Sequence, residues 1–103
     1  MKNFISLFVF ICLAFQIKVV YADYALLQKN NCLACHYIDK RKYGPKLNEV
    51  ALRYANDTNA KEKLAKKIKS GGSGVWGEDI MPPQPHVSNE DAIALAKYIL
   101  SLK

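Results

Sequence analysis

Cys32-Leu33-Ala34-Cys35-His36 is the stretch that decides the fold of this 103-residue chain. Its two cysteines lie three positions apart and a histidine follows directly, which is the attachment pattern for c-type haem. Two thiols at this spacing can add to the two vinyl groups of one porphyrin, and the adjacent histidine is placed to bind the iron from one face. The motif therefore predicts that Cys32 and Cys35 hold haem c covalently and that His36 is an axial iron ligand.

Two other kinds of site could use the same thiols. A structural zinc ion needs four ligands, usually as two Cys/His pairs, and the one further histidine, His86, has no cysteine near it. A thioredoxin-like dithiol follows a strand in a βαβ unit, and no strand pattern precedes Cys32. The sequence favours haem over both alternatives.

The first 22 residues have the pattern of a secretory leader. Lys2 precedes an apolar run over residues 4–15 and the small Ala22 ends the segment, which matches a charged start, an apolar middle and a cleavage site. We expect cleavage after Ala22, which leaves a domain of residues 23–103 in the periplasm, where haem attachment also fits. The alternative is an uncleaved membrane anchor, but the apolar run falls short of the roughly 20 residues that span a bilayer.

Size and charge narrow the function further. A chain this short forms one domain, which excludes an enzyme with separate cofactor and substrate domains. Loss of the leader removes Lys2 and Lys18 and lowers the formal charge from +6 to +4. In an exported protein this charge favours an acidic protein or an anionic membrane surface over nucleic acid, although lysines can also simply solvate the surface.

We expect four helices and no strand after the leader, at residues 24–30, 47–55, 59–70 and 88–102. Apolar residues in the second segment recur at helical spacing from Leu47 to Tyr54. Asn59 with Glu62 would cap the third helix, and Ser88 the fourth. All four phenylalanines lie in the leader, so a bound macrocycle would have to complete the core of so small a domain.

The segment 71–87 is rich in glycine and proline, so it forms a loop. A loop this long in a small domain is normally disordered or functional. Val75, Trp76, Ile80 and Met81 need burial, which favours an ordered loop wrapped over something. Met81 is the only methionine after the leader, and its soft thioether suits ferrous iron. We expect Met81 to be the second axial ligand, with His86 as its rival.

Together these residues resemble the small bacterial class I cytochromes c of the periplasmic c-551/c-552 type, the cytochrome c8 family. The resemblance covers residues 23–103. Beyond the haem motif it rests on Gly44-Pro45, Ile68-Lys69, Gly74-Val75-Trp76-Gly77, Met81-Pro82-Pro83 and Ala96-Lys97. It implies an all-α cytochrome c fold, with about four helices wrapped around one covalently attached haem.

The resemblance also assigns roles to single residues. It implies that the Pro45 carbonyl accepts from the second ring nitrogen of His36 and that Trp76 donates its indole N–H to a haem propionate. Lys67 stands where relatives often carry an arginine near a propionate, and Gln84 where an asparagine often tunes the methionine ligand. The alternatives are that Trp76 is ordinary core and that Pro45 only turns the chain. The expected haem-packing core includes Tyr54, Leu64 and Ile68.

With both axial positions filled, the iron has no place for a substrate, so we expect a monomeric one-electron carrier and not an enzyme. A haem enzyme or gas sensor remains the alternative if Met81 is off the iron, and a dithiol module if no haem is attached. The implied partners are nitrite reductases, cytochrome c peroxidases, terminal oxidases or respiratory-chain donors. A basic cluster would form a docking ring at an exposed haem edge, or merely a solvated face: Lys29, Lys40, Arg41, Lys42 and Lys46.

Overall fold

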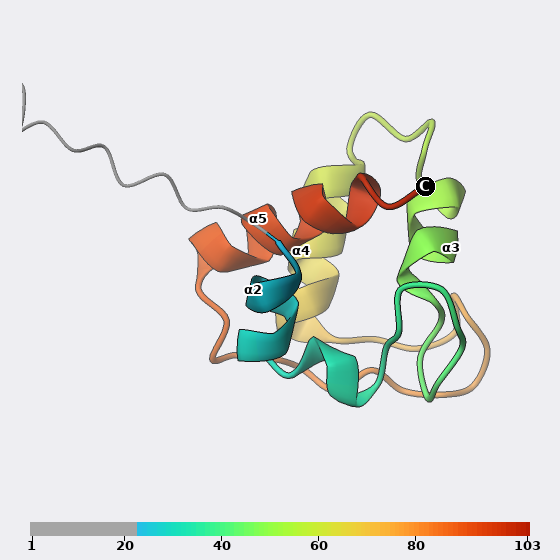
Figure 1. Ribbon diagram of the computed structural model, residues 1–103, viewed down its shortest axis with the longest axis horizontal. Coiled ribbons are helices and arrows are strands. Elements are labelled where there is room, and N and C mark those ends of the chain that lie inside the picture. Colours follow the sequence, from blue (N-terminus) through green and yellow to red (C-terminus); the bar gives the residue numbers. More distant parts are fainter. Residues whose placement is uncertain (1–22) are drawn as a thin grey trace, which may run out of the picture.

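The computed structural model describes residues 23–103, and the predicted leader lies outside the described residues. The elements follow in the order α2 (Tyr24–Lys29), the short 3₁₀ turn η1 (Cys32–Ala34), α3 (Leu47–Arg53), α4 (Ala60–Ser70) and α5 (Asn89–Leu100) (Figure 1). Within this part of the chain there is no strand, only an isolated bridge between Gly72 and Met81. The all-helical prediction is confirmed. None of these helices is long and apolar enough to cross a bilayer.

The helices begin where side chains can satisfy free backbone N–H groups. The Asp23 carboxylate accepts from Leu26 N and starts α2. Ser88 caps α5 as predicted, because its hydroxyl accepts from Asp91 N at 3.1 Å. Asn59 is the N-cap residue of α4 as predicted, but the expected capping bond from its side chain is absent. The Asp57 carboxylate, two residues earlier, accepts from Asn59 N at 2.8 Å.

The core forms where α5 packs against each of the other helices, with its largest interface on α4. Figure 1 shows α5 lying across α4, with α2 and α3 on either side. Leu95 and Ala96 on α5 are fully buried, and the small alanine lets the helices approach closely. The buried residues of α4 are Ala60, Leu64, Ala65 and Ile68, which include the predicted inner face of that helix.

The long loops lie outside this helical core. Residues 35–46 connect η1 to α3, and residues 71–88 connect α4 to α5; Figure 1 shows the two segments running below the helices. The predicted burial of Ile80 is wrong, since its side chain is 61% exposed. Ile80 instead lines a cavity between the two loops. The helices thus form a frame that holds the two loops opposite each other.

Candidate functional site

One mostly apolar cavity lies between the two long loops and the ends of α3 and α4. Its empty space is about 1240 Å³ when the open mouth is included. All the residues singled out from the sequence for this site line it: Cys32, Cys35, His36, Pro45, Tyr54, Leu64, Lys67, Ile68, Trp76, Met81 and Gln84. His86 does not, and it is exposed.

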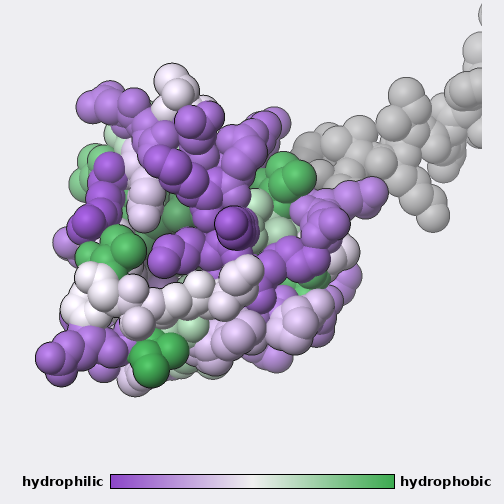
Figure 2. All heavy atoms as spheres, turned by 180° about the vertical axis from the view of Figure 1, so that it is seen from behind, coloured by the Kyte–Doolittle hydropathy of each residue, from purple (hydrophilic) through white to green (hydrophobic). Residues whose placement is uncertain are grey.

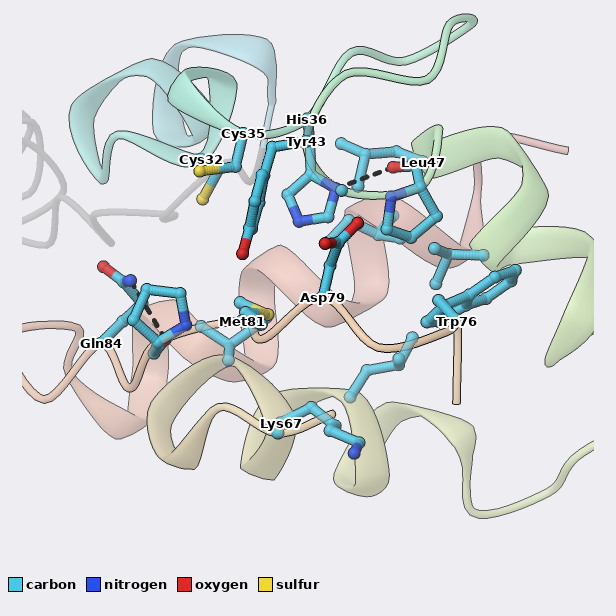
Figure 3. A pocket seen from close by; sticks show the side chains of 18 of the residues that line it. Cys32, Cys35, His36, Tyr43, Leu47, Lys67, Trp76, Asp79, Met81 and Gln84 are labelled. Atoms are coloured by element: carbon cyan, nitrogen blue, oxygen red, sulfur yellow. Dashed lines mark hydrogen bonds between the residues drawn. The ribbon is translucent and has the colours of Figure 1, made fainter. Parts of the chain in front are cut away.

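The two cysteines are placed on one wall by η1. Asn31 precedes this turn in the left-handed conformation, with φ of 59°, and Cys35 N and His36 N both donate to Cys32 O. Figure 3 shows the two sulfur atoms close together at the cavity. Burial raises the pKa of the Cys32 thiol, and Coulombic repulsion from Cys35 adds to this increase. A backbone hydrogen bond of Cys32 opposes this increase in part.

His36 is held by the chain segment that follows it. Its Nδ1 lies 2.8 Å from the Pro45 carbonyl oxygen, and because a carbonyl can only accept, Nδ1 carries the proton. In this tautomer of the neutral ring the Nε2 lone pair is available, and Figure 3 shows this side of the ring facing the cavity. A carbonyl that accepts from one ring nitrogen in this way fixes the ring and makes the other nitrogen a better metal donor.

Met81 lies on the opposite wall, on the loop between α4 and α5 (Figure 3). Its backbone is paired with Gly72, since Met81 N donates to Gly72 O at 2.9 Å and Gly72 N donates to Met81 O at 3.0 Å. Gly71 allows this pairing: its φ is +67°, and a Cβ there would lie 2.3 Å from the Met81 oxygen. The end of α4 thus fixes the backbone position of Met81.

The remaining wall combines aromatic and basic side chains. Tyr54, Lys67 and Trp76 lie at this side of the cavity, and the Lys67 ammonium is held close to Gly72, where a Cβ would come within 2.7 Å of Nζ. Gln84 turns its side-chain amide to Pro82 O at 3.2 Å. The site therefore combines an apolar interior with cationic and hydrogen-bonding groups at its edge.

Some contacts within the site carried no signal in the sequence. Arg41 and Asp79 form an ion pair at 3.4 Å that joins the two loops, and both residues line the cavity, as does Tyr43. Gly44 was recognisable only as part of a Gly-Pro turn, yet it lies against the His36 ring. These contacts join residues from separate loops, so neither spacing nor periodicity could reveal them.

The predicted basic cluster is only partly free. Arg41 pairs with Asp79, and Lys42 donates to Leu33 O at 3.3 Å while lying over the Tyr37 ring. Within residues 23–103, no group of three or more His, Cys, Asp or Glu side chains could hold a metal ion, so a zinc site has no ligand set here. An apolar cavity, two thiols and one imidazole with a free nitrogen fit haem c.

Comparison with known proteins agrees with this site. The family model described as Cytochrome c matches residues 24–103. Cytochrome c-552 of Nitrosomonas europaea is 51% identical over 82 residues, covering 80% of each chain. Cytochrome c-551 of Pseudomonas aeruginosa is 44% identical over 78 residues, covering 76% of this chain and 74% of that one. The crystal structure of the N. europaea protein superposes with a TM-score of 0.78, covering 79% of this chain and all of that one.

Fold and cavity together define a small all-helical haem protein, and the chain belongs to the cytochrome c family. Within class I it lies close to cytochromes c-551 and c-552. It is an electron-transfer protein and not an enzyme, and its cofactor is covalently bound haem c.

Proposed function

We propose that this chain is a periplasmic one-electron carrier in which Cys32 and Cys35 hold the haem and His36 and Met81 are its axial iron ligands. The observation that carries the proposal is the placement of His36 and Met81 on opposite walls of one apolar cavity. When bound, haem c supplies an iron centre that alternates between the ferric and ferrous states. The chain's own residues set how readily it does so.

Each ligand is supported by the backbone around it. The Pro45 carbonyl accepts from His36 Nδ1, which orients the ring and strengthens donation through Nε2. The pairing of Met81 with Gly72 holds a soft thioether on the other side, and such a ligand favours ferrous iron and a higher potential. The apolar walls limit access of water, which also disfavours the more highly charged ferric state.

Replacement of Met81 tests the ligand assignment. We expect Met81→Ala to open the sixth position, so that the ferrous protein binds carbon monoxide rapidly and the reduction potential falls. His86→Ala is the matched control, because His86 is the rival ligand, is exposed and does not line the cavity. An unchanged spectrum and potential in Met81→Ala would overturn the assignment, and rapid carbon monoxide binding by the natural protein would favour a gas sensor or haem enzyme.

We further propose that residues 1–22 are a leader removed after Ala22. Two observations support this boundary: the family match begins at residue 24, and Asp23 caps α2. Cleavage at this position would therefore leave every described element intact. The intact mass and N-terminal sequence of the exported protein test the boundary, with Asp23 as the expected first residue.

We infer that the partners are larger redox proteins with acidic docking surfaces, among them nitrite reductases, cytochrome c peroxidases, terminal oxidases or respiratory-chain donors. The net charge of +6, or +4 without the leader, supports this inference. Attraction between opposite charges increases association rates and is screened by salt. Electron transfer to an acidic acceptor should therefore slow as ionic strength rises, while transfer to an uncharged acceptor should not; rates independent of salt in both cases would contradict an acidic partner.

A further inference from the structure

A basic side chain outside the cavity contacts the cavity wall. Arg53, the last residue of α3, places its guanidinium carbon 4.8 Å from the centre of the Trp76 ring. Trp76 lines the cavity and packs against the hydrophobic core, whereas Arg53 is exposed and is not among the lining residues. The indole therefore connects a cation at the surface to the interior of the site.

Apart from the packing of Trp76 against the core, the turn that carries this residue has few other restraints. Gly74 N donates to Gly77 O at 3.0 Å, and both glycines have positive φ with open space where a Cβ would lie. No side-chain hydrogen bond or ion pair within residues 23–103 reaches residues 73–78. A planar guanidinium stacks well on an aromatic face. Arg53 thus restrains this turn by linking Trp76 to the end of α3.

We propose that Arg53 is a positioning residue that holds Trp76 in its orientation at the haem and thereby raises the reduction potential. The inference rests on the proposed function, in which the cavity holds a redox-active haem. The indole nitrogen can only donate a hydrogen bond, and the anionic groups of haem are its propionate carboxylates. An indole fixed at the wall can neutralise part of that negative charge, whereas a mobile one does so less. Since reduction adds negative charge to the haem, this neutralisation favours the ferrous state.

The reduction potential of the holoprotein tests the proposal. In Arg53→Gln we expect the ratio of reduced to oxidised protein at a fixed electrode potential to fall about threefold, or about 28 mV at 59 mV per tenfold change. Arg53→Lys keeps the charge but loses the planar stack, so its potential should lie between those of Arg53→Gln and the natural protein. Lys61→Gln is the charge-matched control, because Lys61 is exposed, does not line the cavity and, among residues 23–103, pairs only with Glu62, at 3.8 Å.

A double-mutant cycle separates positioning from a direct charge effect. Trp76→Phe removes the indole N–H, so adding Arg53→Gln to this variant should change the potential by less than half as much as in the natural protein. The fluorescence of Trp76, the single tryptophan of the chain, provides a second readout. We expect Arg53→Gln to add a longer-lived component, because a mobile indole spends time in positions where the haem quenches it less.

Two results would overturn the proposal. One is a shift in Arg53→Gln no larger than that in Lys61→Gln. The other is that Arg53→Gln changes the reduction potential equally in the natural protein and in Trp76→Phe, which would mean that Arg53 acts only as a surface charge. Failure of the proposed function is distinguishable from both, because it would show in the natural protein as a missing covalent haem or a missing methionine-ligand band.

Discussion

Gly44 sets how closely the backbone approaches the His36 ring. A Cβ at this position would lie 2.5 Å from His36 Cε1 and 2.8 Å from Nδ1, far inside van der Waals contact. Any side chain at position 44 would therefore push the imidazole away from the position in which Nδ1 bonds to the Pro45 carbonyl.

We expect Gly44→Ala to destabilise the protein by about 1–3 kcal/mol, the usual cost of overpacking, and to lower the fraction of protein with an ordered His36 ligand. Denaturant unfolding of the haem-loaded protein and its visible spectrum measure the two effects. Gly74→Ala is the control, because its φ of +92° makes alanine unfavourable although no atom lies within 4 Å of the Cβ position. It should lose about 1–2 kcal/mol and keep its spectrum; equal spectra in both variants would contradict the role of Gly44.

Individual residues differed in how far the sequence could predict them. The position of His36 follows from the haem motif, and the hydrogen bond that the resemblance implied, from His36 to Pro45, is present at 2.8 Å. The ion pair between Arg41 and Asp79 was not predictable, because it joins residues that meet only when the two loops face each other. The Arg53–Trp76 contact was missed for the same reason.

The helix starts provide a test at the scale of elements. Ser88 bonds to Asp91 N and Asn59 makes no capping bond. We therefore expect Ser88→Ala to destabilise the protein by about 1 kcal/mol and Asn59→Ala to cost much less. Thermal or denaturant unfolding of the two variants provides the comparison, and equal losses would show that the Ser88 bond does not stabilise α5.

An ion pair at the start of α4 makes the folding stability depend on pH. The Lys63 ammonium at 2.7 Å and the Asn59 N–H hold the pKa of Asp57 below its usual value of 3.8. Because the folded state binds this proton less tightly than the unfolded state, the contribution of Asp57 to stability is present above about pH 4 and is lost as pH falls through the lower, folded pKa.

Asp57→Asn should therefore be less stable than the natural protein near neutral pH, and the difference should shrink in acid and at high salt. The effect will be small, because the ion pair lies at the surface, where solvent and salt screen it. The free energy of unfolding measured between pH 3 and pH 7 gives the comparison. Asp39→Asn removes the same charge from a carboxylate with no hydrogen bond or ion pair among the described residues, and a matching pH curve for both variants would contradict the role of Asp57.

Helix existence was easier to predict than helix ends. All four predicted helices are present, and three of them end one or two residues earlier than expected, because apolar periodicity continues past the last backbone hydrogen bond. Tyr54 illustrates this: it shares the apolar spacing of α3 but is the C-cap residue and turns to the cavity. The capping bond expected from the Asn59 side chain is absent, and the Asp57 carboxylate instead accepts from the backbone N–H of Asn59.

At the scale of the whole molecule, the cavity replaces part of the core. The four helices bury a small set of mainly aliphatic residues. Some of these core residues also line the cavity, among them Leu27, Leu47 and Leu64. Such a domain lies near the lower size limit for stability from an apolar core alone. We therefore expect the covalently bound macrocycle to complete the hydrophobic core.

We expect the polypeptide prepared without haem to lose cooperative folding. Removal of the macrocycle exposes the apolar cavity walls and separates the two loops that face it. Amide NMR dispersion and thermal unfolding of haem-free and haem-loaded protein test this directly. Well-dispersed native signals and a cooperative transition without haem would contradict the prediction.

Charged side chains cover much of the surface of the molecule. Figure 2 shows one face covered largely by hydrophilic residues, with only separate hydrophobic patches. Four lysines of α4 contribute to the polar surface of the molecule: Lys61, Lys63, Lys66 and Lys69. Composition predicted this positive charge, but only the folded chain shows which cations are already paired, such as Lys63 with Asp57.

The central claim is that His36 and Met81 bind the iron of a covalently held haem, and the visible spectrum of the exported protein tests it most directly. The colour should remain with the polypeptide after denaturation and acid-acetone extraction. The reduced protein should show sharp bands, and the oxidised protein the weak red-edge charge-transfer band of methionine sulfur on ferric haem. A covalent haem without that band would contradict Met81 as ligand, and colour lost on extraction would contradict attachment through Cys32 and Cys35.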